Sequence, residues 1–261
     1  MHQKDKKMSQ KSKFEESVSE DEPVDEEVQQ AYAPRAIYVE GAKPDLSKMQ
    51  IPTLRLAQGM TAEVTDRKAQ IGQYVLSNFP PKDDVVLVPL GAVNIRSYKP
   101  DAKRAPACHA PGPILIPGRG FMLKGIGDPG IVCEDCPLSK WGPKREGRSN
   151  TPPPCKEGVA VRAYSVTHRT LVDFTFMGRA QGKGTFVQSQ MMAWGEGKFA
   201  IRLSSASTKN DRGTWYEPEV AMLDEIPEEH LSAVERWHEL HQSSIISASQ
   251  AQALFSLSDG A

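Results

Sequence analysis

The stretch VAVRAYSVTHRTLVDFTFM, residues 159–177, decides the fold. Its two halves, 159–166 and 171–177, alternate apolar with polar residues, and the polar segment 167–170 separates them. Such a pattern predicts a β-hairpin whose strands bury one face each. The residues expected on the buried faces are Val159, Val161, Ala163 and Ser165 in the first strand and Val172, Phe174 and Phe176 in the second.

Upstream of this hairpin the sequence predicts three strands. Residues 52–56 and 71–76 are short apolar segments around a polar turn, which indicates two short strands. Residues 85–98 form a long strand whose second half alternates, with an irregularity expected near Pro89 and Gly91.

Downstream, apolar residues recur at steps of three and four from about Thr185 to Trp194, which predicts a short helix. Two more strands follow at 199–203 and 214–220, and Pro227 opens a helix that reaches about Gln242. The predicted order is a strand, an insertion, a hairpin, a helix and two strands. This is the order of a five-stranded OB-type barrel. The predicted class is therefore mainly β (α+β), with a C-terminal helix added.

Four cysteines, all between residues 108 and 155, interrupt the strand pattern. Cys133 and Cys136 form a Cys-x-x-Cys turn followed by proline, with Cys108 upstream and Cys155 downstream. This spacing predicts one structural zinc ion held by four thiolates. Two alternatives stay open: a pair of disulfides, and His109 as a ligand in place of Cys108. The N-terminus has no apolar leader, which favours reduced thiols and a cytoplasmic location.

Charge is segregated along the chain although the total is only −1. Residues 95–185 carry 15 Lys and Arg against 7 Asp and Glu, whereas residues 216–261 carry one Arg against 9 acids. A cationic centre is typical of proteins that attract phosphates. We expect an acidic disordered segment at 1–45, an OB-like domain at 46–223 with a zinc insertion at 100–156, and an acidic helix and tail at 224–261.

The segment from Cys133 to Cys155 contains a Cys-x-x-Cys-Pro turn, a Trp-Gly pair and a Pro-Pro-x-Cys end. In these motifs the chain resembles phage-encoded proteins of the replication region. Over residues 50–223 its element order is similar to the zinc-containing single-stranded DNA-binding proteins of T-even phages, which use three Cys and one His. The resemblance gives the liganding role to Cys133, Cys136 and Cys155, while Cys108 is assigned by count. It implies a host-cell cytoplasmic location and single-stranded DNA as the partner.

An OB-type barrel binds single strands by stacking bases on aromatic rings while Lys and Arg follow the backbone. Tyr98 and Tyr164 are the candidate stacking residues, and Trp141 is expected to cover the zinc site instead. The candidate cations are Arg96, Lys99, Lys103, Arg104, Lys140, Lys144, Arg145, Arg162 and Arg169.

Catalysis is not expected. The acids near the cysteines, Asp128, Glu134 and Asp135, do not form the carboxylate cluster that a nuclease needs, and no phosphate-binding glycine loop is present. His238 and His241 lack the zinc-protease spacing, and we expect them on a solvated helix face. The alternative function is a zinc-containing regulatory factor that docks on a polymerase or nuclease subunit. Its acidic ends would then contact replication or transcription proteins, and no membrane partner is expected.

Overall fold

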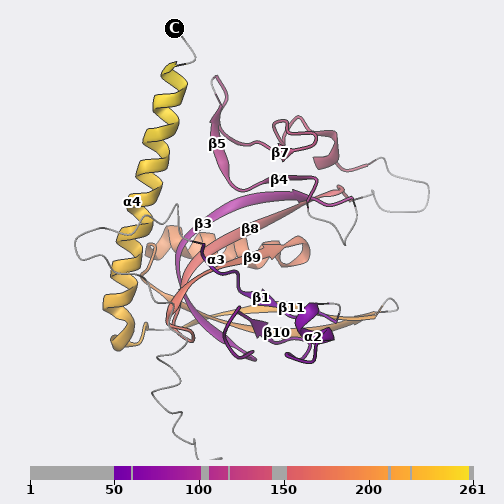
Figure 1. Cartoon of the computed structure of the whole chain (residues 1–261), viewed down its shortest axis with the longest axis vertical. Helices are drawn as coiled ribbons and strands as arrows, with labels where there is room; N and C mark the ends of the chain where they lie inside the picture. Colours follow the sequence, from indigo (N-terminus) through magenta and orange to yellow (C-terminus); the bar gives the residue numbers. More distant parts are fainter. Residues whose placement is uncertain are drawn as a thin grey trace, which may run out of the picture. The chain divides into compact units, whose positions relative to one another are not determined.

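The fold is built around one long, bent strand, β3 (Val85–Tyr98), which belongs to a seven-stranded antiparallel sheet. In this computed structural model β3 pairs with β10 (Ala200–Asn210) along one edge and with β8 (Cys155–Ser165) along the other. Figure 1 shows β3 as a continuous arc across the sheet. The structure describes residues 50–59, 61–100, 106–116, 118–142, 152–210, 213–223 and 225–258.

The bend of β3 has a local cause. Its register with β8 shifts between Pro89 and Gly91, where proline removes one ladder donor. Beyond the shift, the end of β3 leaves β10 and pairs with β4 (Cys108–Ala110) through Arg96, Ser97 and Tyr98. The irregularity expected at Pro89 and Gly91 is confirmed.

Two hairpins complete the main sheet. β8 turns into β9 (Thr170–Met177), with Ser165 opposite Thr170, so the expected hairpin is confirmed. β10 pairs with β11 (Gly213–Leu223) from Ala200 opposite Leu223 to Asn210 opposite Gly213. These two strands are longer than expected, because polar residues after Leu203 continue the ladder.

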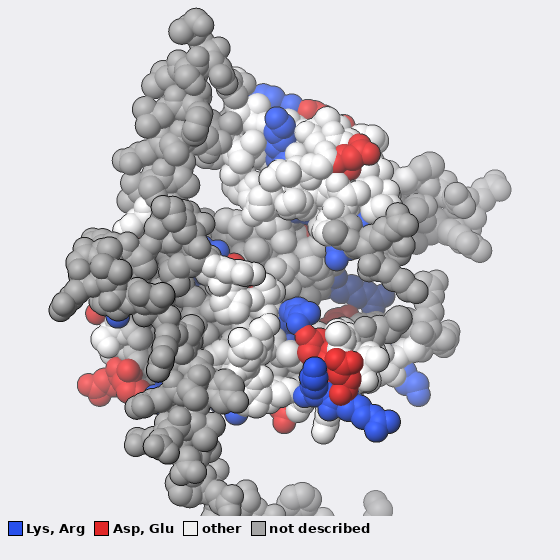
Figure 2. Space-filling view, viewed as in Figure 1, with Lys and Arg blue, Asp and Glu red and all other residues white. Residues whose placement is uncertain are grey.

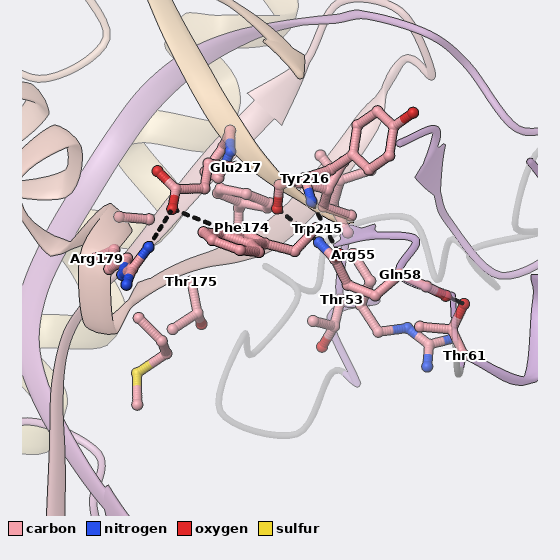
Figure 3. A pocket seen from close by; sticks show the side chains of 15 residues that line it. Thr53, Arg55, Gln58, Thr61, Phe174, Thr175, Arg179, Trp215, Tyr216 and Glu217 are labelled. Carbon is pink, nitrogen blue, oxygen red and sulfur yellow. Dashed lines mark hydrogen bonds and ion pairs between the residues drawn. The ribbon is translucent and has the colours of Figure 1, made fainter. Parts of the chain in front are cut away.

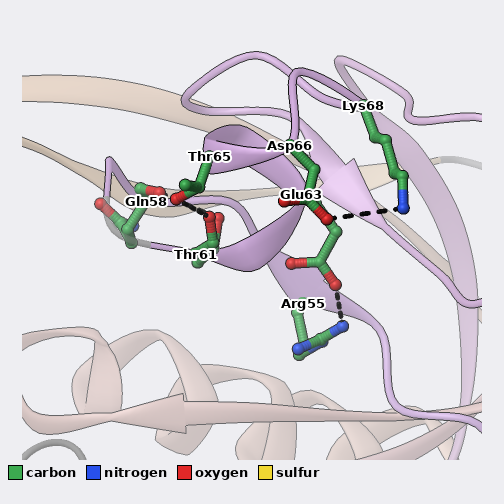
Figure 4. A network of polar contacts seen from close by, with 7 residues as sticks. All are labelled: Arg55, Gln58, Thr61, Glu63, Thr65, Asp66 and Lys68. Carbon is green, nitrogen blue, oxygen red and sulfur yellow. Dashed lines mark hydrogen bonds and ion pairs between the residues drawn. The ribbon is translucent and has the colours of Figure 1, made fainter.

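The short elements before β3 lie against the edge of the sheet. β1 (Arg55–Leu56) pairs with β2 (Tyr74–Val75), and α2 (Ala62–Thr65) connects them. Hydrogen bonds within the 58–65 turn and the ion pairs Arg55–Glu63 and Lys68–Asp66 hold this segment together (Figure 4).

Helix α3 (Gln181–Trp194) follows a 3₁₀ turn, η3 (Gly178–Ala180), and starts four residues earlier than expected. Val187 and Met191 enter the core enclosed by the sheet, which also contains the hairpin residues Phe174 and Phe176. The core assignment of these two phenylalanines is confirmed. Gly184 lets α3 approach β8 and β9 closely, since a Cβ there would lie 2.6 Å from that of Val159.

Helix α4 (Glu228–Ser258) begins where Pro227 predicts and continues past the expected end at Gln242. Its residues Val234 and Leu240 pack on the opposite face of the sheet, against Val88, Leu90 and Tyr164. Figure 1 shows α4 running beside the sheet. Among the described helices, none has the length and apolar character required to cross a bilayer.

The region between β3 and β8 is rich in proline and glycine and consists of short pieces. They are β4, β5 (Pro113–Ile116), β6 (Gly120–Leu123), β7 (Ile126–Gly127) and the 3₁₀ turn η2 (Pro137–Ser139). We call the described residues 106–142 the cysteine region. The main β sheet has no closing ladder between β9 and β11, so the described strands form an open sheet rather than a closed barrel.

Candidate metal centre and nucleic-acid interface

All four cysteines are buried and none forms a disulfide. Tyr98 of β3 lies opposite Cys108 of β4 on one side and opposite Cys155 of β8 on the other. Residues opposite one another in a ladder point to the same face of the sheet, so both thiols belong to one face. The two cysteines that are 47 positions apart in sequence are thus placed on strands flanking the same residue.

The other two cysteines form a tight turn supported by its own hydrogen bonds. The Cys133 N–H donates to the Leu123 carbonyl at 2.8 Å, and the Cys136 N–H donates to the Cys133 carbonyl at 3.3 Å. The Ser139 hydroxyl lies 2.7 Å from the Cys136 carbonyl, and Pro137 opens η2. This turn is the local structure that the Cys-x-x-Cys-Pro sequence predicts.

The thiols interact electrostatically with one another. Burial raises the pKa of the Cys133 thiol, Arg96 opposes this, and the thiols of Cys155, Cys108 and Cys136 raise it further. Burial also raises the pKa of Cys155, again against Arg96 and with Cys136 and Cys108. Thiolates formed at these positions would repel one another, so the cluster suits a divalent cation, which would replace the thiol protons and compensate the negative charge.

The four thiols are not arranged as a complete metal-binding site in this structure. No group of three or more His, Cys, Asp or Glu side chains in the described ranges is arranged to hold a metal. Two observations nevertheless fit the donor set. A Cβ at Gly125 would collide with the Cys108 sulfur, so only glycine fits beside this thiol. His109, in contrast, is exposed and alternates to the other face of β4, which favours Cys108 as the ligand.

The cations expected to contact nucleic acid divide into two groups. On the sheet, Arg162 is engaged by Asp173, with its Nε–H at 2.9 Å and its Nη2 at 3.0 Å from the carboxylate oxygens. Arg96 is paired with Glu157 and its side chain is only 18% exposed. Lys99, Lys140 and Arg169 are exposed. Lys103, Arg104, Lys144 and Arg145 lie outside the described residues.

The expectation that Tyr164 offers its ring to a base needs correction. Its side chain is 3% exposed, and its hydroxyl lies 3.1 Å from Nδ1 of His230 in α4. The sequence pattern correctly places Tyr164 on the face of the strand that points away from the core of Val161 and Ala163. Helix α4 covers that second face, so the ring is buried there as well. Tyr98 is half-buried between the two cysteine-bearing strands.

Trp141 also differs from expectation. It was expected to cover the zinc site, but it is 64% exposed, and Phe121 in β6 is 72% exposed. Residue type alone could not identify these rings as exposed, because a Pro- and Gly-rich region of this size would normally use its aromatics as core. The exposed lysines of the same part of the fold are Lys99, Lys124, Lys140 and Lys156.

A separate hollow of about 520 Å³ lies between β9, β11 and the segment 53–58. On one side the Arg179 guanidinium stands 4.9 Å from the centre of the Trp215 ring, and the Trp215 Nε1–H donates to Glu217 at 2.8 Å (Figure 3). On the other side the Gln58 carboxamide both donates to and accepts from the backbone of Tyr216. Gln58 therefore pairs with β11 as the peptide group of a neighbouring strand would.

Surface charge near this end of the sheet is mixed. Figure 2 shows Lys and Arg interspersed with Asp and Glu around α2, and the ion pairs there are Arg55–Glu63 and Lys68–Asp66. Searches against protein-family models, curated proteins and solved structures found no match to this chain.

Proposed function

We propose that this chain is a sequence-tolerant single-stranded DNA-binding protein of phage-type replication or recombination. In this proposal its frame has the strand order of an OB fold, open between β9 and β11, and is stabilised by one structural zinc ion. The bound strand stacks bases on the exposed rings of the cysteine region and pairs its phosphates with the surrounding lysines. The protein performs no catalysis.

The strand pairing supports the OB strand order. In OB order the first strand, bent at its middle, pairs with the second and the fourth, and the third and fifth strands close the barrel. Here β3 pairs with β8 and β10, β8 pairs with β9, and β10 pairs with β11. The closure between β9 and β11 is replaced by the segment 53–58. Leu54 donates its N–H to the Asp173 carbonyl of β9 at 2.9 Å, while Gln58 holds β11.

The observation that carries the binding proposal is the exposed surface around the cysteine region. Phe121 and Trp141 are large rings that are mostly exposed. Exposed aromatic rings among cations are the elements that sequence-tolerant single-strand binders use, because every base has a face to stack. Most described arginines on the main sheet are paired with carboxylates, so the lysines near the cysteines are better placed to meet phosphate.

Zinc has a structural role in this proposal. Cys108, Cys133, Cys136 and Cys155 would hold it, and four thiolates leave no open position for a reactive water. When bound, the metal supplies the order that the short elements of the cysteine region lack, so it fixes the two rings and the lysines in place. Metal removal should therefore weaken DNA binding together with the local fold.

The test is a fluorescence titration of the purified protein with a single-stranded oligothymidine, the matching duplex and an RNA of equal length. Each titration is run at about 50 and 200 mM salt. We expect the single strand to bind most tightly and its affinity to fall steeply with salt, because bound cations release condensed counterions. Trp141→Ala and Phe121→Ala should each lose about 1–3 kcal/mol of binding free energy.

Trp194→Ala is the matched control, since Trp194 is 66% exposed but lies at the end of α3. It should leave DNA affinity unchanged. Preference for duplex, or affinity that ignores salt, would contradict the proposal.

A docking function in regulation is the second candidate, and one feature of α3 favours it. Phe186, Met192 and Trp194 are 40%, 89% and 66% exposed on this helix. Large apolar side chains left exposed on a helix can contact a protein partner. If the Trp194 variant loses a protein partner such as a polymerase or nuclease subunit while the Trp141 variant keeps DNA affinity, this second function becomes the better one.

A further inference from the structure

Arg96 lies on the same face of the sheet as two of the cysteines. It precedes Tyr98 by two residues on β3, so the two side chains share a face, and Tyr98 is directly opposite Cys108 and Cys155. The partners opposite Arg96 itself are Ala110 on β4 and Glu157 on β8. Ala110 is the smallest chiral side chain, which leaves room on the cysteine side of the guanidinium.

The guanidinium is mostly buried and only partly satisfied. One nitrogen, Nη2, is paired with Glu157, while Nη1 is buried without a hydrogen-bond partner among the described atoms. A buried, unpaired guanidinium N–H is costly, and most such groups in native proteins have an acceptor. The Arg96 charge also opposes the rise in the pKa of the Cys133 and Cys155 thiols, so it favours their thiolate forms, and a thiolate of this cluster is the acceptor that suits Nη1.

We propose that Arg96 is the internal counter-ion of the four-thiolate centre and donates N–H···S hydrogen bonds from Nη1 to its sulfurs. This inference rests on the zinc site of the proposed function. A zinc ion with four thiolates has surplus negative charge, and its burial is costly unless a cation compensates it. Arg96 supplies that cation, and Glu157 orients it through Nη2. The residue predicted from sequence to contact nucleic acid thus acts on the metal instead.

The test compares the wild-type chain with Arg96→Met and Arg96→Lys. Zinc affinity is measured by competition with a chromogenic chelator, and the sulfur-to-metal charge-transfer band is recorded after substitution with Co²⁺. Arg96→Met should lose about 10–100-fold in zinc affinity, the usual effect of removing a group that supports metal ligands. Its Co²⁺ band should shift, since loss of N–H···S bonds changes the electron density on sulfur, which a merely structural role would not do.

Arg96→Lys covers the case in which the methionine variant does not fold. It keeps the positive charge but cannot hold Glu157 and a sulfur together, because lysine lacks the planar fork of arginine. It should therefore fold and show an intermediate affinity. Arg202→Met is the matched control, because Arg202 also lies on a strand of the main sheet and faces a carboxylate, that of Asp84, but at an exposed site on the part of the sheet that has no cysteine. It should retain wild-type affinity and spectrum.

The outcomes separate the two proposals. If the wild-type chain binds no zinc, the metal site and the Arg96 inference both fail. If it binds one zinc per chain and both Arg96 variants keep wild-type affinity and spectrum, the Arg96 inference alone is overturned and the zinc site stands.

Discussion

His241 in α4 is a buried titratable residue whose ring packs against the backbone of Gly91 in β3. A Cβ at Gly91 would overlap its ring, so the glycine at the β3 irregularity is what admits the histidine. Both ring nitrogens are buried and without a partner in the described part of the chain. Burial lowers the pKa of His241 to about 4, Arg162 and His238 add to this, and Asp173 opposes it. The solvated position expected for this residue is therefore wrong.

This burial predicts acid sensitivity. A histidine that titrates near 6.5 when unfolded and near 4 when folded makes the unfolded state bind more protons between these values. Stability should be unaffected above pH 6.5 and should fall as the pH drops from about 6.5 toward 4. Buried His168, whose pKa is also lowered to about 4, chiefly by burial, acts in the same direction. Each should contribute about 1–2 kcal/mol of loss by pH 5.

Urea unfolding at pH 7.5 and pH 5 measures this loss. His241→Gln should reduce the difference between the two pH values, whereas His109→Gln, a change at an exposed position, should not. An unchanged difference in the His241 variant would show that the ring is not buried neutral.

Tyr164 makes a second prediction at this scale, because its burial assigns it to stability rather than to binding. Tyr164→Phe removes the hydrogen bond with His230 and should cost about 1 kcal/mol of unfolding free energy. Tyr164→Ala leaves a cavity under α4 and should cost about 3–5 kcal/mol. Thermal denaturation measures both. The phenylalanine variant should bind single-stranded DNA as the wild type does, and a loss of affinity in that variant would return Tyr164 to the binding surface.

At the scale of elements, α3 contains two glycines with opposite surroundings. At Gly184 an added Cβ would lie 2.6 Å from the Cβ of Val159 and 2.9 Å from that of Phe176, whereas at Gly182 it would meet nothing within 4 Å. Alanine is the better helix former at both positions. We expect Gly182→Ala to raise the unfolding free energy by up to about 1 kcal/mol and Gly184→Ala to lower it by about 1–3 kcal/mol.

Chemical denaturation of the two variants tests the contact between helix and sheet. Each variant serves as the control of the other, because the substitution and the helix are the same. Equal effects of the two substitutions would mean that α3 does not approach β8 this closely.

The elements that could be predicted from the sequence are those whose signal lies within the element itself. The 159–177 hairpin alternates, β3 has Pro89 and Gly91 at its irregularity, and Pro227 marks the start of α4. The lengths of β10 and α4 were not predictable in this way. Polar residues after Leu203 extend β10 only because β11 pairs with them, and residues after Gln242 give no periodic apolar signal.

In the candidate site, too, local features could be predicted and contacts between distant residues could not. The Cys-x-x-Cys turn is local and was predicted, but the neighbours of Arg96 and Arg162 were not. Glu157 lies 61 residues from Arg96, so no sequence window brings the two charges together. Exposure of Trp141 and burial of Tyr164 depend in turn on which elements cover them, which residue type does not specify.

For the whole molecule, charge segregation has a structural counterpart in α4. The acidic segment 224–261 carries one Arg against 7 acids. Because this charge can only repel phosphate, the sequence alone predicts that removing the segment leaves DNA binding intact or strengthens it. The structure changes that expectation, because α4 buries Val88, Leu90 and Tyr164. Deleting the helix would expose this apolar surface and destabilise the sheet, so truncation does not isolate the effect of charge.

Neutralising the charges of α4 without removing the helix isolates that effect. Glu228, Glu229, Glu235 and Glu239 are exposed, so replacing all four with Gln should leave the packing of Val234 and Leu240 in place. Fewer negative charges repel phosphate less, and this repulsion acts within about a Debye length, ~10 Å at 0.1 M salt. We therefore expect the Gln variant to bind oligothymidine several-fold more tightly at about 50 mM salt, with the gain lost near about 0.5 M.

The matched control replaces the same four residues with Asp, which shortens each side chain but keeps its charge. Fluorescence titrations of both variants at the two salt concentrations provide the comparison. The Asp variant should bind as the wild type does, since phosphate responds to charge rather than to side-chain length. A gain in both variants would point to loosening of α4 instead of charge. A gain in neither would place the bound strand beyond the electrostatic reach of this helix, toward the far end of the cysteine region.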